Sequence, residues 1–118
     1  MKRVIVVEDD PDISEMLMLA FKTINIKLTC YDNGEIIMEG RYEYPDLFIL
    51  DKQLPGIDGL DVCRHLKSQN ETRSIPVIMM SANLRIAELS GHAGADDMIM
   101  KPFNLDKLTK MVLHYLGE

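Results

Sequence analysis

The segment PDLFILD, residues 45–51, decides the fold of this chain. Pro45 opens the segment, the apolar run 47–50 has no polar alternation, and Asp51 closes it. A short, continuous apolar run of this kind is typical of a strand that is buried on both faces, as in a parallel sheet covered by helices. The segment therefore predicts a central strand that ends in a single carboxylate.

Similar short runs recur along the chain, and longer amphipathic segments separate them. The runs are residues 4–7, 26–30, 47–50, 77–80 and 98–100. Helical spacing of apolar residues, or a helix-start signal such as Asp10-Pro11, marks the segments between and after them. These segments are residues 11–24, 36–38, 60–67, 84–89 and 105–116. The fourth of them is expected to end near Gly91 and Gly94. This alternation predicts an α/β fold, in which a doubly wound parallel sheet has helices on both faces.

Length and composition fit one domain that covers residues 1–118. The net charge of -6 argues against direct binding of nucleic acid or of an anionic membrane by this domain, because both need clustered Lys and Arg. No apolar run approaches the roughly 20 residues that span a bilayer. We expect a soluble, cytoplasmic protein in which Cys30 and Cys63 are reduced thiols.

Polar side chains close four of the five apolar runs. They are the acidic triplet at residues 8–10, then Asp51, Ser81 and Lys101. In open parallel sheets, ligands bind outside the carboxyl ends of the strands. If the four strands are neighbours, the sequence places several carboxylates, one hydroxyl and one ammonium group at the same edge.

This set of groups favours phosphoryl-transfer chemistry. Clustered carboxylates raise one another's pKa, and a divalent cation removes that cost. Mg²⁺ prefers oxygen ligands and often bridges carboxylates and a phosphate. A carboxylate can itself act as a nucleophile and form an aspartyl-phosphate. Each residue alone also has a local explanation as a helix cap or turn residue, so the hypothesis depends on their convergence.

These residues resemble the receiver domain of two-component response regulators. The match covers essentially the whole chain. It is carried by residues 6–10, 45–51, 54–59, 76–82 and 94–103, in that order. The resemblance implies a flavodoxin-like (βα)5 sandwich whose five parallel strands lie in the order 2-1-3-4-5.

The resemblance also implies roles for single residues. Asp51 is expected to be the phosphoacceptor, and Ser81 and Lys101 are expected to contact the phosphoryl group. Asp10 is expected to cap a helix. The expected Mg²⁺ site comprises Glu8, acting mostly through water, Asp9, Asp51 and the backbone carbonyl of Gln53.

By resemblance, the chain is a switch in a His-Asp phosphorelay. A sensor histidine kinase or a phosphotransfer protein would donate the phosphoryl group. The chain would assist its own phosphorylation and dephosphorylation and would not otherwise be an enzyme. Phosphorylation would shift the output face, formed by the fourth helix, the fifth strand and the fifth helix, toward an effector or a second copy. The Lys101–Pro102 peptide bond is expected to be cis.

The switch residues depart from the family pattern. Receivers usually carry Tyr or Phe three residues before the lysine, whereas this chain has Met98. In the family, that aromatic ring turns inward as the hydroxyl, here that of Ser81, moves toward the phosphate. Met is flexible and lacks a ring, so we expect a weaker conformational response at position 98.

The output face also departs from the pattern of the DNA-binding branch, which often dimerises there through paired acids and bases. Asp96 and Asp97 supply the acids, but residues 104–118 contain no Arg. Lys107 and Lys110 could pair with acids, though less rigidly than a guanidinium group. We therefore do not expect that dimer mode.

Two other functions share features with this sequence. Phosphatases with an aspartate nucleophile place a second Asp two residues later as the general acid, and here that position is Gln53. A flavodoxin-like electron carrier would need a phosphate-binding loop after the first strand. The acidic segment at residues 8–10 would repel a flavin phosphate, so both alternatives are disfavoured.

Overall fold

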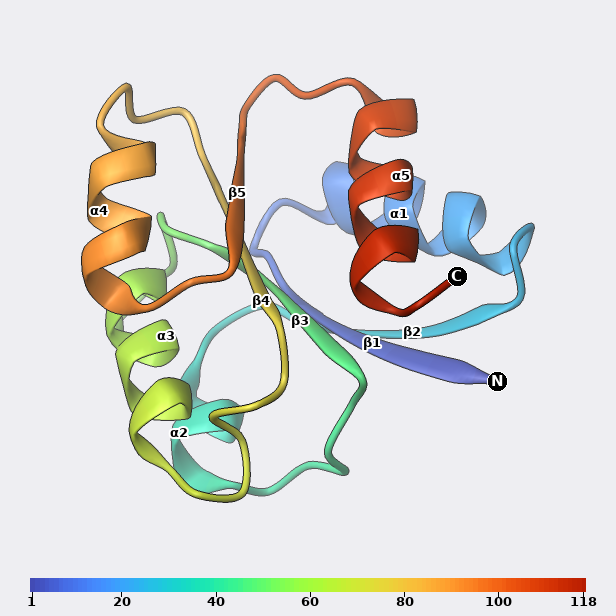
Figure 1. Ribbon diagram of the computed structural model, residues 1–118. Coiled ribbons are helices and arrows are strands. Elements are labelled where there is room, and N and C mark those ends of the chain that lie inside the picture. The colour runs from blue at the N-terminus through green and yellow to red at the C-terminus, as the bar shows by residue number, and fades with distance from the viewer.

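The computed structural model describes residues 1–118, in which five strands alternate with five helices (Figure 1). The strands are β1 (Lys2–Val7), β2 (Ile26–Tyr31), β3 (Leu47–Asp51), β4 (Val77–Ser81) and β5 (Asp97–Met100). The helices are α1 (Pro11–Lys22), α2 (Glu35–Glu39), α3 (Gly59–Ser68), α4 (Ile86–Ala93) and α5 (Leu105–Tyr115). The predicted alternation of strands and helices is confirmed.

All neighbouring strands are parallel, and their order is β2-β1-β3-β4-β5. This confirms the flavodoxin-like arrangement. Asp51 is paired in register with Met80, and Ser81 with Met100. The carboxyl ends of β3, β4 and β5 therefore lie at one edge of the sheet.

Two helical layers enclose the sheet. α1 and α5 cover one face, and α2, α3 and α4 cover the other (Figure 1). In β3, Leu47 and Ile49 belong to the core on the α1 side, whereas Phe48 and Leu50 belong to the core on the α3 side. Burial on both faces explains why this segment has no polar alternation.

The fourth helix differs from its prediction. The sequence predicts it at residues 84–89 with an end near Gly91 and Gly94, whereas α4 spans Ile86–Ala93 and continues through Gly91. The predicted end is confirmed at the second of these glycines, because Gly94 is the C-cap. Leu84 precedes it and is 85% exposed. The buried face of α4, which includes Ile86, Ser90 and Ala93, extends the helix to Gly94, whose φ of 84° suits a helix end. Packing has here overridden the low helix propensity of Gly91.

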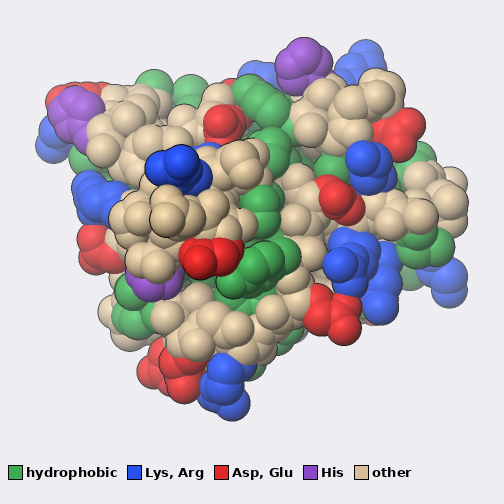
Figure 2. All heavy atoms as spheres, turned by 60° about the horizontal axis from the view of Figure 1, so that its bottom comes forward, with side chains coloured by type: hydrophobic (Ala, Val, Ile, Leu, Met, Phe, Trp, Pro, Cys, Tyr) green, Lys and Arg blue, Asp and Glu red, His purple; other side chains and the backbone are tan.

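The surface carries charges of both signs. On the face drawn in Figure 2, acidic and basic side chains are interspersed and neither sign forms a continuous patch. None of the helices has the length and apolar character that a membrane-spanning helix requires. The face drawn in Figure 2 therefore lacks the clustered Lys and Arg that binding of an anionic polymer needs.

Candidate functional site

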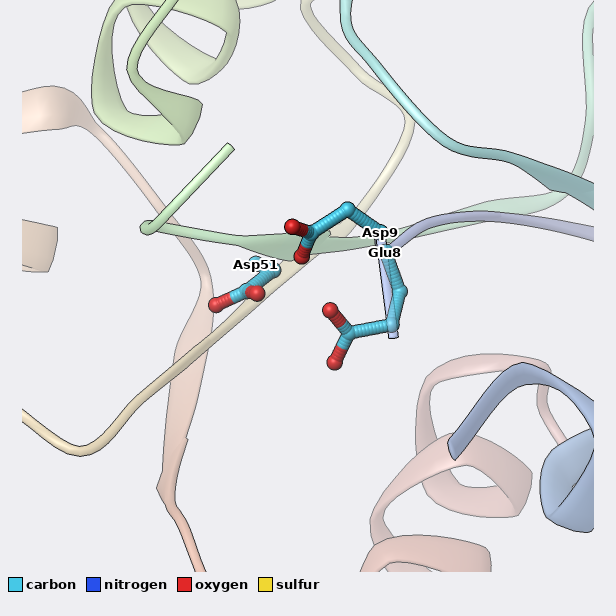
Figure 3. Close-up of side chains that lie close together, drawn as sticks. All are labelled: Glu8, Asp9 and Asp51. Carbon is cyan, nitrogen blue, oxygen red and sulfur yellow. The ribbon is translucent and has the colours of Figure 1, made fainter. Parts of the chain in front are cut away.

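The acidic residues predicted to converge do so at the carboxyl edge of the sheet. Glu8 and Asp9 directly follow β1, and Asp51 is the last residue of β3. Figure 3 shows their three carboxylates turned toward a common space. One carboxylate oxygen from each residue lies within 4.8 Å of the others. This is a set of hard oxygen ligands of the kind that Mg²⁺ prefers.

Lys101 reaches the same space from the segment after β5. Its Nζ lies 2.6 Å from Glu8 Oε1 and 3.0 Å from Asp51 Oδ2. Burial lowers the pKa of Lys101, but its hydrogen bonds to Glu8 and Asp51 more than offset this, so the pKa lies above the ordinary value of 10.5. The side chain therefore supplies a permanent positive charge beside Asp51. The expected cis peptide bond between Lys101 and Pro102 is present.

Two of the three carboxylates are almost completely buried. Glu8 and Asp51 are each 2% exposed, whereas Asp9 is exposed. Burial, and then the neighbouring Asp51 carboxyl, raises the pKa of Glu8 from 4.5 to about 7 despite the contact with Lys101. The single ammonium group of Lys101 thus does not fully offset the negative charge of the three carboxylates, so binding of a further cation at this site is favourable.

Ser81 and Gln53 occupy the expected places, with local hydrogen bonds. Ser81 is fully buried, and its Oγ accepts a hydrogen bond from Asn83 N at 2.9 Å. The backbone N–H of Gln53 donates to Asp51 Oδ1 at 3.2 Å, and Gln53 is exposed. The bond from Asn83 N uses Ser81 Oγ as the acceptor, so the hydroxyl hydrogen stays available to donate to a phosphoryl group on Asp51.

The side chains of Asp10 and Met98 are not part of this cluster. Asp10 caps α1 as predicted, because its Oδ1 accepts a hydrogen bond from Asp12 N at 2.9 Å. Met98 is half-buried against the core on the α3 and α4 side of the sheet. Ile86 and Ala93 of α4 belong to the same core as Met98. Position 98 therefore lies on the side of the sheet that α4 covers, and α4 is part of the expected output face.

Two contacts are not predicted from the sequence. The sequence assigns Glu8 to the metal alone, yet it pairs with Lys101 across 93 residues. Lys52 has no role in the sequence-based prediction, yet its Nζ lies 2.9 Å from Asp58 Oδ2, next to the phosphoacceptor candidate. No local sequence pattern predicts either contact, because both depend on how strands and loops pack against one another.

The geometry agrees with comparison to known proteins. The sequence profile of the response regulator receiver domain matches residues 4–113. The chain belongs to this family. A receiver domain is the switch module of a two-component phosphorelay, and this match confirms the resemblance and the function class predicted from the sequence.

Individual relatives support the assignment. The DNA-binding response regulator MtrA of Mycolicibacterium smegmatis is 34% identical over 114 residues, which are 94% of this chain and 49% of that protein. The chain spans about half the length of the curated relatives it matches. The match therefore concerns one half of such a regulator, and it does not carry over the whole protein's activity.

Solved structures show the same fold. A response regulator from Chloroflexus aurantiacus has a TM-score of 0.91 and 28% identity, covering 99% of this receiver and 98% of that chain. The response regulator TrrA of Thermotoga maritima, solved in complex with Mg²⁺ and BeF, has a TM-score of 0.84 and 32% identity, covering 98% and 99%. The latter structure shows that a related receiver binds Mg²⁺.

The acids of the output face are engaged within the receiver. Asp96 Oδ2 accepts hydrogen bonds from Lys67 Nζ at 2.7 Å and from Val77 N at 2.8 Å. Asp97 Oδ2 accepts from Tyr115 OH at 3.0 Å. Both carboxylates thus have partners in their own chain, which reduces what they offer to a second copy.

Proposed function

We propose that Asp51 is the phosphoacceptor of a switch that takes its phosphoryl group from a phosphohistidine. The observation that carries this proposal is the convergence of Asp51 with Glu8, Asp9 and Lys101 at the carboxyl edge of the sheet. In the reaction, an Asp51 carboxylate oxygen forms a bond to phosphorus while the phosphorus–nitrogen bond of the donor breaks. The electron pair stays on the imidazole, which takes a proton from solvent.

The residues present fit a Mg²⁺ ion. Asp9, Asp51 and the Gln53 carbonyl would hold it, with Glu8 acting mostly through water. The ion would neutralise charge on the transferring phosphoryl oxygens. The fit rests on the donor set, because three carboxylates converge and the one ammonium group among them, that of Lys101, pairs with only Glu8 and Asp51. The Mg²⁺ complex of TrrA supports the proposal by relationship.

Lys101 and Ser81 would stabilise the product. Lys101 Nζ already contacts the Asp51 carboxylate, so it needs little movement to donate a charge-assisted hydrogen bond to a phosphoryl oxygen. The Ser81 hydroxyl, which only accepts in its bond with Asn83 N, would add a neutral hydrogen bond as a donor. With these groups the chain assists its own phosphorylation and dephosphorylation, and it remains the acceptor of the group and not an enzyme acting on another substrate.

The donor would be a sensor histidine kinase or a phosphotransfer protein, and the output face would be α4, β5 and α5. Ser81 and Met98 would couple the site to that face, which could bind an effector or a second copy. Because Asp96 and Asp97 are paired internally, an effector is favoured over a dimer built on those acids. We expect no direct binding of nucleic acid or of a membrane by residues 1–118.

The test is labelling with a small phosphodonor, acetyl phosphate, in the presence of Mg²⁺. Intact-mass measurement should show one added phosphoryl group, and hydroxylamine should remove it, as expected for an acyl phosphate. Asp51→Asn should abolish the label, whereas Asp10→Asn, which keeps a good helix cap beside the site, should not. Equal labelling of Asp51→Asn and the wild type would show that another residue is the acceptor.

A further inference from the structure

The loop between β3 and α3 carries Asp51 at its start and is closed by contacts of Lys52. The Lys52 carbonyl accepts a hydrogen bond from Gly59 N at 3.0 Å. The Lys52 side chain closes the same loop a second time, because its Nζ lies 2.9 Å from Asp58 Oδ2. Gln53, whose carbonyl belongs to the proposed Mg²⁺ site, lies inside the loop that both contacts close.

Asp58 ties the loop to α3. Its Oδ1 accepts a hydrogen bond from Leu60 N at 2.8 Å and so caps the helix, while its Oδ2 faces Lys52. One carboxylate therefore connects the first turn of α3 to the residue directly after Asp51. The orientation of the loop depends on that helix end.

The Lys52–Asp58 pair differs from the surface ion pair on the same helix. The Lys52 side chain is 15% exposed and that of Asp58 is 38% exposed. In the pair between Arg64 and Asp61, the corresponding values are 49% and 59%. Exposed pairs contribute little because solvent screens them, whereas a shielded ammonium that loses its partner is costly. Solvent therefore screens the Lys52–Asp58 pair less than it screens the Arg64–Asp61 pair.

Gly59 fits against the phosphoacceptor's own backbone. A Cβ at position 59 would lie 1.9 Å from the Asp51 carbonyl oxygen and 3.0 Å from Lys52 Cα. Only a residue without a side chain allows α3 to approach β3 this closely. The start of α3 and the end of β3 are therefore in direct van der Waals contact. A displacement of the start of α3 would shift the backbone at Asp51.

We propose that Lys52 and Asp58 are positioning residues, which hold the backbone of Asp51–Gln53 so that the Gln53 carbonyl and the Asp51 carboxylate face the same Mg²⁺ ion. This inference rests on the proposed function, since it concerns how the proposed site is assembled. Neither side chain is a ligand. Both act through the backbone that they fix.

A positioning role and a purely electrostatic role predict opposite results for Lys52→Met. Removal of a cation near the site makes the site more negative, which by itself strengthens Mg²⁺ binding. Loss of the loop geometry weakens binding instead. Asp58→Asn keeps a capping oxygen but removes the charge, so both mechanisms predict weaker binding for it. The sign of the Lys52→Met effect therefore separates the two.

The experiment is calorimetric titration of the wild type, Lys52→Met, Asp58→Asn and the double variant with Mg²⁺. Substitutions of residues that orient metal ligands commonly weaken affinity by 10–100-fold, and we expect about tenfold here. The double variant should be no weaker than either single variant, because one pair is removed in all three. Lys52→Arg should restore part of the affinity, and Arg64→Met, which breaks the exposed pair on the same helix, should bind like the wild type. Unchanged or tighter binding by Lys52→Met, or additive losses in the double variant, would overturn the proposal.

A measurement without metal keeps the inference separate from the Mg²⁺ site itself. Hydrogen exchange of the Gly59 amide, which donates to the Lys52 carbonyl, should accelerate in metal-free Lys52→Met and Asp58→Asn and stay unchanged in Arg64→Met. If Asp9→Asn binds Mg²⁺ as tightly as the wild type, the proposed metal site fails, and the exchange result still decides whether Lys52 and Asp58 hold the loop. Equal exchange in all variants would refute the positioning role.

Discussion

Asp51→Asn should stabilise the metal-free protein, and the gain should depend on pH. The Glu8 pKa is raised from 4.5 to about 7, first by burial and then by the Asp51 carboxyl. A group whose pKa is raised on folding contributes stability that is complete below the unfolded pKa and is lost as pH rises through the folded pKa. The wild type should therefore lose stability between about pH 4.5 and pH 7.

The size of the effect follows from the same values. Each pKa unit is worth about 1.4 kcal/mol, so the whole shift corresponds to about 3–4 kcal/mol. Burial is the largest cause and remains in the variant, so the charge on Asp51 accounts for a smaller part, on the order of 1 kcal/mol. Lys101 keeps its contact with Glu8 at 2.6 Å, so the substitution does not isolate the ammonium group. For a domain of this length, about 1 kcal/mol raises the melting temperature by about 4 °C.

Thermal unfolding in a metal chelator at pH 8 and pH 5 would test this. Asp51→Asn should melt about 4 °C above the wild type at pH 8, with a smaller difference at pH 5, where Glu8 is protonated in both. Mg²⁺ should raise the melting temperature of the wild type more than that of the variant. Asp10→Asn should behave as the wild type at both pH values. If Asp51→Asn melts at or below the wild-type temperature at pH 8, the repulsion between Glu8 and Asp51 is weaker than the attraction between Asp51 and Lys101.

Two further predictions concern α4 and β5. Gly91→Ala should raise the free energy of unfolding by about 0.5–1 kcal/mol, because Gly91 lies within α4 and a Cβ there meets no atom within 4 Å. The matched control, Gly94→Ala, should lower the free energy of unfolding, because φ at position 94 is 84°. Denaturant unfolding measures both, and similar midpoints for the two variants would contradict the assignment of Gly94 as the helix end. Met98→Tyr should enlarge the shifts of the α4 amides in NMR spectra on addition of a phosphoryl mimic, because burying a flexible Met costs more side-chain entropy than burying a ring, and an unchanged response would exclude position 98 as the coupling element.

The sheet could be predicted from the sequence because its signals are local. The run at residues 47–50 is apolar throughout, and two-sided burial by α1 and α3 is the physical reason. The site followed from the rule that ligands lie at the carboxyl ends of parallel strands, which brought Asp51 and Lys101 together although 50 residues separate them. No side-chain detail was needed for that step.

What could not be predicted depends on packing between elements. The bounds of α4 are set by contacts of Ile86 and Ala93, which outweigh the local signal of Gly91. The partner of the Ser81 hydroxyl, Asn83 N, is decided by a side-chain rotamer. The pairing of Lys52 with Asp58 requires α3 to lie against the end of β3, which only the bare Cα of Gly59 permits. Contacts of this kind between elements produce no periodic pattern in the sequence.

The internal engagement of Asp96 gives α4 one fixed end. Asp96, just beyond the C-terminal end of the helix, is held by Lys67 and Val77 N, and its carbonyl accepts a hydrogen bond from Tyr115 OH at 2.9 Å. The opposite end, at Arg85, has no side-chain cap and is joined to Ser81 by a short loop. Asn83 links this end to Ser81, because its backbone amide donates to Ser81 Oγ at 2.9 Å and its side-chain oxygen accepts from Arg85 N at 2.8 Å. The helix is about 12 Å long, so a tilt of about 10° about the Asp96 end would carry its first residue by about 2 Å. A movement of Ser81 would therefore reach the start of α4 through Asn83, and the displacement would be largest there and smallest at Asp96.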